Sequence, residues 1–190
     1  MSGDTEVLVV DDEARLADLF AAWIGTGRPV ETAYSGDEAL EKMTHDVDIV
    51  LLDRRMPGLS GDEVLESIRE AGYDCRIVMV TAVDPDFDII EMGFDDYLVK
   101  PVSKDELLEI IDSMESRSAY KSDIQEYYSL VSKKALLESE KPHRELETNE
   151  EYAELCRRVE EYRSVVDETV AGMSSHHEFV GAFQDIESEH

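Results

Sequence analysis

The residues IVLLDRRMPGLSG, from Ile49 to Gly61, carry the clearest structural signal in this sequence. Four apolar residues run directly into Asp53, and Pro57 and Gly58 follow as turn formers. A short apolar run that ends at turn residues is typical of a buried β-strand. An aspartate at the end of such a strand needs an explanation, because carboxylates are rarely buried without a partner.

Four further apolar runs resemble this one, and amphipathic segments separate them. The five predicted strands cover residues 7–10, 30–33, 48–52, 77–80 and 97–99. Each is largely apolar on both faces, as are parallel strands that helices cover on both sides. The alternation predicts an α/β fold in which a five-stranded parallel sheet is doubly wound, with helices on both faces.

Capping boxes mark the expected helix starts, because a serine or threonine three residues before a glutamate can satisfy the first backbone N–H groups of a helix. They occur at Ser35 with Glu38, Ser60 with Glu63, Ser103 with Glu106, and Thr148 with Glu151. The segment between Pro85 and Gly93, after the fourth strand, is too short for an ordinary helix. It predicts a short, distorted one.

Beyond about residue 115 the strand pattern stops, and we expect two domains, residues 1–116 and 117–190. A helix is predicted from about 120 to 139, before Pro142. The next helix carries a coiled-coil-like seam, with spacings of three and four: Tyr152, Leu155, Val159, Tyr162, Val166, Thr169 and Met173. The seam fits either an all-α helical hairpin or a dimeric coiled coil. A short terminal helix is expected around 179–186.

The chain is strongly acidic, with 46 acidic residues against 18 basic ones and a net charge of −28. Such a charge opposes binding to nucleic acids or anionic membranes at ordinary salt. A surface suited to very high salt explains it, as would a basic partner, and we favour the halophilic explanation. No apolar run approaches the ~18 residues of a membrane span, and the polar, acidic start lacks a secretory signal pattern. We therefore expect a cytoplasmic protein.

Polar side chains follow the predicted strands at the points where they end. Asp11 and Asp12 follow the first strand, Asp53 the third, Thr81 the fourth and Lys100 the fifth. The carboxyl ends of parallel strands meet at one edge of a sheet. Clustered carboxylates need a cation or shifted pKa values, and an all-oxygen set with room for water suits Mg²⁺. An aspartate there can act as a nucleophile toward a phosphoryl group, with a lysine stabilising the developing charge.

Four segments around these residues, "VLVVDDE", "VLLDRRMPG", "VTA" and "DDYLVKP", together resemble the receiver domain of two-component response regulators. The resemblance covers residues 6–115. It implies a flavodoxin-like fold and a phosphorelay in which a sensor histidine kinase phosphorylates the chain with Mg²⁺. It implies that the chain is not an enzyme, although the chain would assist its own phosphorylation and dephosphorylation. The phosphoryl group would switch a helical output module, with transcriptional regulation as the candidate process.

The resemblance also assigns roles to individual residues. Asp53 is implied as the phosphoacceptor. Thr81 is implied as the switch hydroxyl and Lys100 as the amine that contacts the phosphoryl group. Tyr97 is implied as an aromatic rotamer switch, and Pro101 is expected to follow a cis peptide bond.

The same resemblance implies a Mg²⁺ site. Asp12 and Asp53 are the implied direct ligands, with the backbone carbonyl of Arg55, and Asp11 is the implied carboxylate that acts through water. The Arg55 side chain stands where family members face the phosphoryl group, so it would either hold that group or hinder attacking water. Its neighbour Arg54 is expected at the surface.

One departure from the family concerns the interval between Thr81 and Lys100, which is shorter than in typical receivers. The missing length falls in the fourth helix, part of the usual signalling face. The phosphorylation site is unaffected, but the conventional dimerisation mode of receivers is not expected to carry over unchanged.

The C-terminal residues 120–187, beginning "YKSDIQEYYSLVSKKALLESE", resemble more loosely the HalX domain that follows receivers in halophilic archaea. This resemblance implies no particular activity, but it agrees with the acidic composition. The expected partners are a sensor histidine kinase and a second copy of the chain, through the helical region or the receiver face. Direct DNA binding has no motif to support it, and no membrane partner is expected.

Two other functions stay open from the sequence. One is a coiled-coil adaptor whose receiver is inert. The other is a phosphatase with an aspartate nucleophile, a class that uses a second acid two residues after the nucleophile. Arg55 occupies that position and counts against it.

The charge leads to a testable prediction. We expect the thermal unfolding midpoint to rise with KCl up to molar concentrations, because the screening length falls to ~3 Å at 1 M and the repulsion between acidic side chains fades. Stability that stays constant from low to molar salt would contradict the halophilic explanation.

Overall fold

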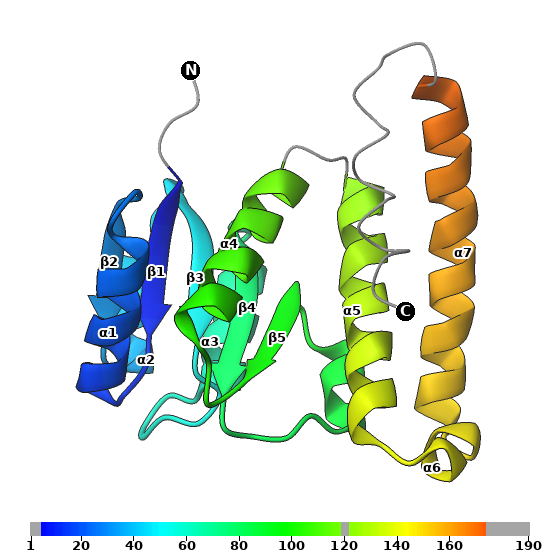
Figure 1. The fold of residues 1–190 in the computed structure, drawn as a ribbon, viewed down its shortest axis with the longest axis horizontal. Helices are drawn as coiled ribbons and strands as arrows, with labels where there is room; N and C mark the ends of the chain where they lie inside the picture. Colours follow the sequence, from blue (N-terminus) through cyan, green and yellow to red (C-terminus); the bar gives the residue numbers. More distant parts are fainter. Residues whose placement is uncertain (1–4, 119–121, 174–190) are drawn as a thin grey trace.

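A computed structural model describes residues 5–118 and 122–173. Its centre is a sheet of parallel strands in the order β2-β1-β3-β4-β5. The strands are β1 (Glu6–Val10), β2 (Val30–Ala33), β3 (Val47–Leu52), β4 (Arg76–Thr81) and β5 (Asp96–Val99). All five lie where the sequence predicted them, and their order confirms the doubly wound α/β architecture (Figure 1).

Helices cover both faces of the sheet, and a helical pair stands beside β5 (Figure 1). The helices are α1 (Ala14–Ile24), α2 (Gly36–Lys42), α3 (Gly61–Glu70), α4 (Lys104–Ser118), α5 (Ser122–Glu140), α6 (His143–Glu147) and α7 (Glu150–Met173), with a 3₁₀ helix η1 (Phe87–Glu91). One buried cluster joins the sheet to α1 and α4, and the other joins it to α2, α3, η1 and the C-terminal helices. None of the described helices is long and apolar enough to cross a membrane.

Strand β3 shows why the predicted strands are so apolar. Ile49 and Leu51 belong to the cluster with α1 and α4, whereas Val50 and Leu52 belong to the cluster on the opposite face. None of these four positions faces solvent, because helices cover both sides of the strand. Asp53 therefore directly follows a fully buried stretch of β3 and lies at the carboxyl edge of the sheet.

The loop after β3 closes tightly on itself. Gly58 has a φ of 75°, a conformation that glycine adopts at little cost. An added Cβ at Gly61 would lie 2.0 Å from the carbonyl oxygen of Asp53, and the Gly61 N–H donates to the carbonyl of Arg54 at 2.9 Å. Only a glycine at position 61 lets α3 begin directly beside the end of β3.

The predicted capping boxes form to different extents. Those at Ser60 and Ser103 are complete, because each serine exchanges hydrogen bonds with its glutamate. The box at Ser35 forms by half. The Ser35 hydroxyl oxygen accepts the N–H of Glu38, but the Glu38 carboxylate accepts the N–H of Tyr34 and not that of Ser35. The box at Thr148 was predicted wrongly. Asn149 caps α7, since its side-chain oxygen accepts an N–H of the first turn, whereas the Thr148 hydroxyl donates to carbonyls of α6.

The segment after β4 forms only the short helix η1, which confirms the prediction of a short, distorted helix. Five residues cannot cover the adjoining face of β4 and β5, and α5 packs there. Leu130 and Leu137 of α5 are fully buried in the same cluster as Ile89 and Ile90 of η1 and Phe94 before β5. The C-terminal helices thus contribute to the core of the sheet.

Polar side chains of α5 reach backbone carbonyls around η1. Ser129 Oγ donates to the carbonyl of Phe94 at 2.8 Å. Lys133 Nζ donates to the carbonyls of Ile90 and Met92 at 3.1 and 2.5 Å. Lys133 is only 5% exposed, and a buried ammonium is costly unless oxygens surround it. The contact therefore holds α5 in one position relative to η1.

The seam on α7 packs inside the monomer. Leu155 and Val159 belong to the buried cluster that contains the α5 leucines, and α5 and α7 lie side by side (Figure 1). Of the two arrangements that the sequence left open, the structure has the helical hairpin. The seam side chains Thr169 and Met173 and the helix predicted around 179–186 lie outside what the structure describes.

Burial gives Lys133 an unusual titration. It lowers the pKa of Lys133 to about 8, while the Glu126 carboxylate acts to raise that pKa and the Arg158 guanidinium acts to lower it. In the unfolded chain the lysine keeps its proton up to its ordinary pKa of 10.5. Between these two values the unfolded chain binds more protons than the folded one, so the free energy of unfolding rises with pH.

We expect this rise, about 3 kcal/mol across the window, to be missing from Lys133→Met. Urea unfolding measured from pH 7 upward should show the wild type gaining stability relative to that variant. Lys134→Met removes the neighbouring, partly exposed lysine that pairs with Glu138, and it should follow the wild type. Parallel pH profiles for wild type and Lys133→Met would contradict a buried, destabilised ammonium at this position.

Candidate functional site

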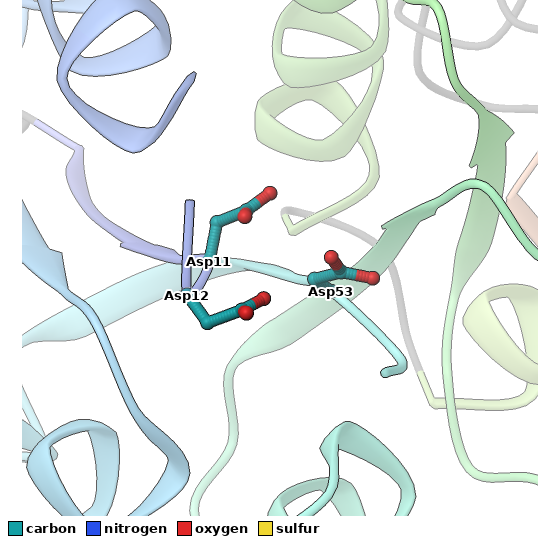
Figure 2. A group of neighbouring side chains, drawn as sticks. All are labelled: Asp11, Asp12 and Asp53. Atoms are coloured by element: carbon teal, nitrogen blue, oxygen red, sulfur yellow. The ribbon is translucent and has the colours of Figure 1, made fainter. Parts of the chain in front are cut away.

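The carboxyl ends of β1 and β3 bring three aspartates together. Figure 2 shows the side chains of Asp11, Asp12 and Asp53 turned toward a common space. One carboxylate oxygen from each lies within 4.8 Å of the others. Asp11 is 2% exposed and Asp53 is 8% exposed, whereas Asp12 faces solvent. The structure thus brings together the three acids that the sequence placed at this edge.

Lys100 reaches the same cluster from the end of β5, and the peptide bond between Lys100 and Pro101 is cis, as expected. Lys100 Nζ donates to Asp11 Oδ2 at 2.5 Å and to Asp53 Oδ2 at 2.9 Å. Burial alone would lower the pKa of Lys100, but its hydrogen bonds to these two aspartates and their charges outweigh burial and raise it. The lysine is therefore a positioned cation beside Asp53.

One ammonium cannot neutralise three carboxylates. Burial raises the pKa of Asp11, although its hydrogen bonds with Lys100 and with the N–H of Glu13 act in the opposite direction. The remaining negative charge favours a further cation. An oxygen-only set of ligands with one solvent-facing member, Asp12, suits a hard divalent ion that keeps some of its water. The residues present therefore fit Mg²⁺.

Thr81 and Tyr97 meet at a single residue of the loop between β4 and η1. The Thr81 hydroxyl oxygen accepts the N–H of Val83 at 3.3 Å, and the Tyr97 hydroxyl donates to the carbonyl of Val83 at 2.7 Å. Both side chains are buried. A movement of Thr81 would thus change the surroundings of Tyr97. Sequence reasoning missed Val83, because its part in the site is made by its backbone.

The two arginines after Asp53 lie in different surroundings. Arg55 donates its backbone N–H to Asp53 Oδ1 at 3.3 Å, and the residue is exposed. Arg54 was expected at the surface, and this prediction is wrong. Its guanidinium binds Asp62 of α3 and Asp88 of η1, and 11% of its side chain is exposed. These long-range pairs leave no local sequence pattern, and they tie the loop that carries Asp53 to η1.

Many curated proteins resemble this chain at the level of sequence, and two of them are described by their identity and coverage. A Haloferax volcanii protein named "Putative transcriptional regulator" is 50% identical over 159 residues, which cover 83% of this chain and 27% of that protein. The transcriptional regulatory protein DltR of Streptococcus agalactiae is 40% identical over 107 residues, covering 54% of this chain and 48% of DltR. The chain spans less than half the length of either relative. The haloarchaeal match agrees with the halophilic explanation of the charge.

A solved structure and two family models identify the family to which this chain belongs. The response regulator TrrA of Thermotoga maritima, in complex with Mg²⁺ and BeF, matches with a TM-score of 0.52 and 35% identity, covering 58% of this chain and 98% of TrrA. The model of the response regulator receiver domain matches residues 7–112, more than half of the chain, and the model of the HalX domain matches residues 116–183. The chain therefore belongs to the response regulator receiver family of two-component systems and carries a HalX domain behind its receiver.

Proposed function

We propose that Asp53 accepts a phosphoryl group from a sensor histidine kinase and that the C-terminal helices carry the response. One observation supports this most strongly. A carboxylate that retains some exposure lies beside two further acids and a lysine, at the carboxyl edge of a parallel sheet. The family match supports the same role, because receivers work as partners of histidine kinases.

The residues around Asp53 would have separate tasks in the transfer. The Asp53 carboxylate attacks the phosphorus of a phosphohistidine, the P–N bond breaks, and an aspartyl-phosphate forms. Lys100 already donates to Asp53, and its ammonium would follow the new negative charge onto a phosphoryl oxygen. The Thr81 hydroxyl, which now accepts the N–H of Val83, would turn to donate to another phosphoryl oxygen.

Asp11, Asp12, Asp53 and the backbone carbonyl of Arg55 would hold Mg²⁺ in this arrangement. When bound there, the ion neutralises charge on the transferring phosphoryl group. The close approach of the three carboxylates supports this cofactor. The complex of TrrA with Mg²⁺ supports it independently.

Under this proposal the chain is a switch and not an enzyme. It takes one phosphoryl group and assists its own dephosphorylation. The relatives named as transcriptional regulators support transcription as the regulated process. A cytoplasmic location and a homodimer through the helical region or the receiver face stay predictions.

Incubation with acetyl phosphate and Mg²⁺ tests the phosphorylation. We expect intact-mass spectrometry to show one added phosphoryl group on the wild type and none on Asp53→Asn. Asp46→Asn changes an exposed acid just before the other end of β3 and should gain the group like the wild type. Asp12→Asn removes a solvent-facing ligand and should slow the modification at least about tenfold, because Mg²⁺ then binds more weakly.

Each other outcome favours a different function. Equal modification of wild type and Asp53→Asn would place the acceptor elsewhere and refute the assignment of Asp53. A wild type that gains no phosphoryl group would support the inert-receiver adaptor. Turnover of many phosphate esters would support the phosphatase.

A further inference from the structure

A pocket lies at the turn of the C-terminal hairpin, where α6 connects α5 to α7 (Figure 1). Its volume is about 440 Å³, and small-molecule sites in proteins generally measure roughly 300–1,000 Å³. Its walls come from the end of α5, from α6 and from the start of α7, and they include Glu138, Leu146, Tyr152 and Cys156. The proposed phosphorylation of Asp53 involves none of these residues, so the pocket needs an explanation of its own.

Much of the pocket wall is apolar. Leu146 of α6 is only 4% exposed, and Ala153 of α7 adds a methyl group to the wall. Lys141 contributes its aliphatic stem, because its ammonium binds Asp86, which does not line the pocket. Cys156 has a free thiol, which behaves as a small apolar group. A ligand with an apolar body therefore gains by leaving water here.

Two carboxylates give the pocket an excess of negative charge. Glu138 accepts hydrogen bonds from Lys134 Nζ at 2.5 Å and from the Tyr152 hydroxyl at 2.6 Å, both through its Oε1 atom. No other side chain in the described part of the chain donates to Glu138, so its Oε2 atom can accept from a ligand. Glu147 also lines the pocket, and His143 Nε2 lies 3.3 Å from its carboxylate. The pocket therefore attracts a cation and repels an anion.

The Tyr152 side chain adds an aromatic ring and a hydrogen-bond donor. Burial raises the pKa of Tyr152, and the Glu138 carboxylate and the Cys156 thiol act in the same direction. The hydroxyl therefore keeps its proton, donates to Glu138 Oε1 and holds that carboxylate in place. Aromatic rings attract cations through their electron-rich faces, and more strongly where water is excluded. A ring beside a positioned carboxylate is thus a combination that favours ammonium groups.

We propose that this pocket binds a small organic cation, with its ammonium group against Glu138 and Tyr152 and its apolar body against Leu146 and Ala153. A metal ion suits the pocket less, because among residues 5–118 and 122–173 only the aspartate cluster brings three metal-binding side chains close together. The assignment does not depend on the phosphorylation of Asp53. It gives the C-terminal domain a binding activity of its own.

The reactivity of Cys156 in the full chain tests the proposal. Iodoacetamide alkylates exposed thiols, and mass spectrometry follows Cys156 and Cys75 separately in molar KCl. Cys75 is 1% exposed and serves as an unreactive internal reference. Benzyltrimethylammonium is the probe, because it joins an apolar ring to a permanent positive charge. We expect it to slow the alkylation of Cys156 with a midpoint of about 1 mM, and by about tenfold at ten times that concentration. Phenylacetate, an anion with the same ring, should not protect.

Two variants with matched controls locate the binding. Glu138→Gln keeps the shape of the side chain and removes its charge, so the midpoint of protection should rise at least about fivefold. Glu140→Gln, an exposed acid of the same helix that does not line the pocket, should behave like the wild type. Ala153→Phe fills the pocket with a ring that also shields Cys156, so binding to this variant is read from the thermal midpoint. The probe should raise that midpoint in the wild type and in Ala22→Phe, an exposed alanine of α1, but not in Ala153→Phe.

Four results would overturn the proposal. If Cys156 proved as unreactive as Cys75 without the probe, the pocket would be closed to small molecules. Equal protection by benzyltrimethylammonium and phenylacetate, or protection by neither, would refute a site for organic cations. Protection that grows with protein concentration alone would assign the pocket to a second copy of the chain. None of these results bears on the phosphorylation of Asp53, which the acetyl phosphate experiment tests separately.

Discussion

A parallel sheet needs a helical cover over both faces, and η1 is too short to cover the sheet beside β4 and β5. The α5 helix supplies the missing cover, with Leu130 and Leu137 buried in the core of the sheet. Each such leucine contributes about 1.5–3 kcal/mol relative to an exposed one. The family models meet near residue 116, but α4 before that point and α5 after it cover opposite faces of the same sheet.

At the edge where the strands end, the sheet brings charged side chains together, in contrast to its apolar faces. There Asp11, Asp12 and Asp53 are brought together although their charges repel, and one ammonium from Lys100 joins two of them. Such a cluster does not stabilise the fold by itself, because buried charges lose hydration. The packing of the buried strands on either side of the sheet holds this cluster in place. A site of this kind is ready to accept positive charge or to be reorganised by a new negative one.

These two features are connected through a few residues of one loop. Val83 is bound by the Thr81 and Tyr97 hydroxyls, and Asp86 and Asp88 bind cations from opposite sides of η1. Between β4 and β5 the chain forms only the short helix η1, and both the loop that carries Asp53 and the C-terminal hairpin contact this one segment.

The sequence by itself determined the strands, their parallel arrangement and the acids, hydroxyl and lysine at their ends, because burial and strand period leave a local pattern. It indicated the caps at Ser60 and Ser103, because a capping box is also a local pattern. It misplaced the α7 cap by one residue, because Thr148 and Asn149 both suit that role. Whether the seam of α7 would pack within the monomer stayed open, since the same pattern serves a hairpin and a dimer.

Only the tertiary structure decided where the unpatterned residues act. Lys133 looks like an ordinary helix lysine, and its partner carbonyl at Ile90 lies 43 positions away. Arg54 looks like a surface residue, and its partner Asp88 lies 34 positions away. Gly61 looks like a loop glycine, and its role depends on the backbone of Asp53. Contacts of this kind depend on distance in space, which periodicity along the chain does not record, so they appear only once the sheet has brought its ends together.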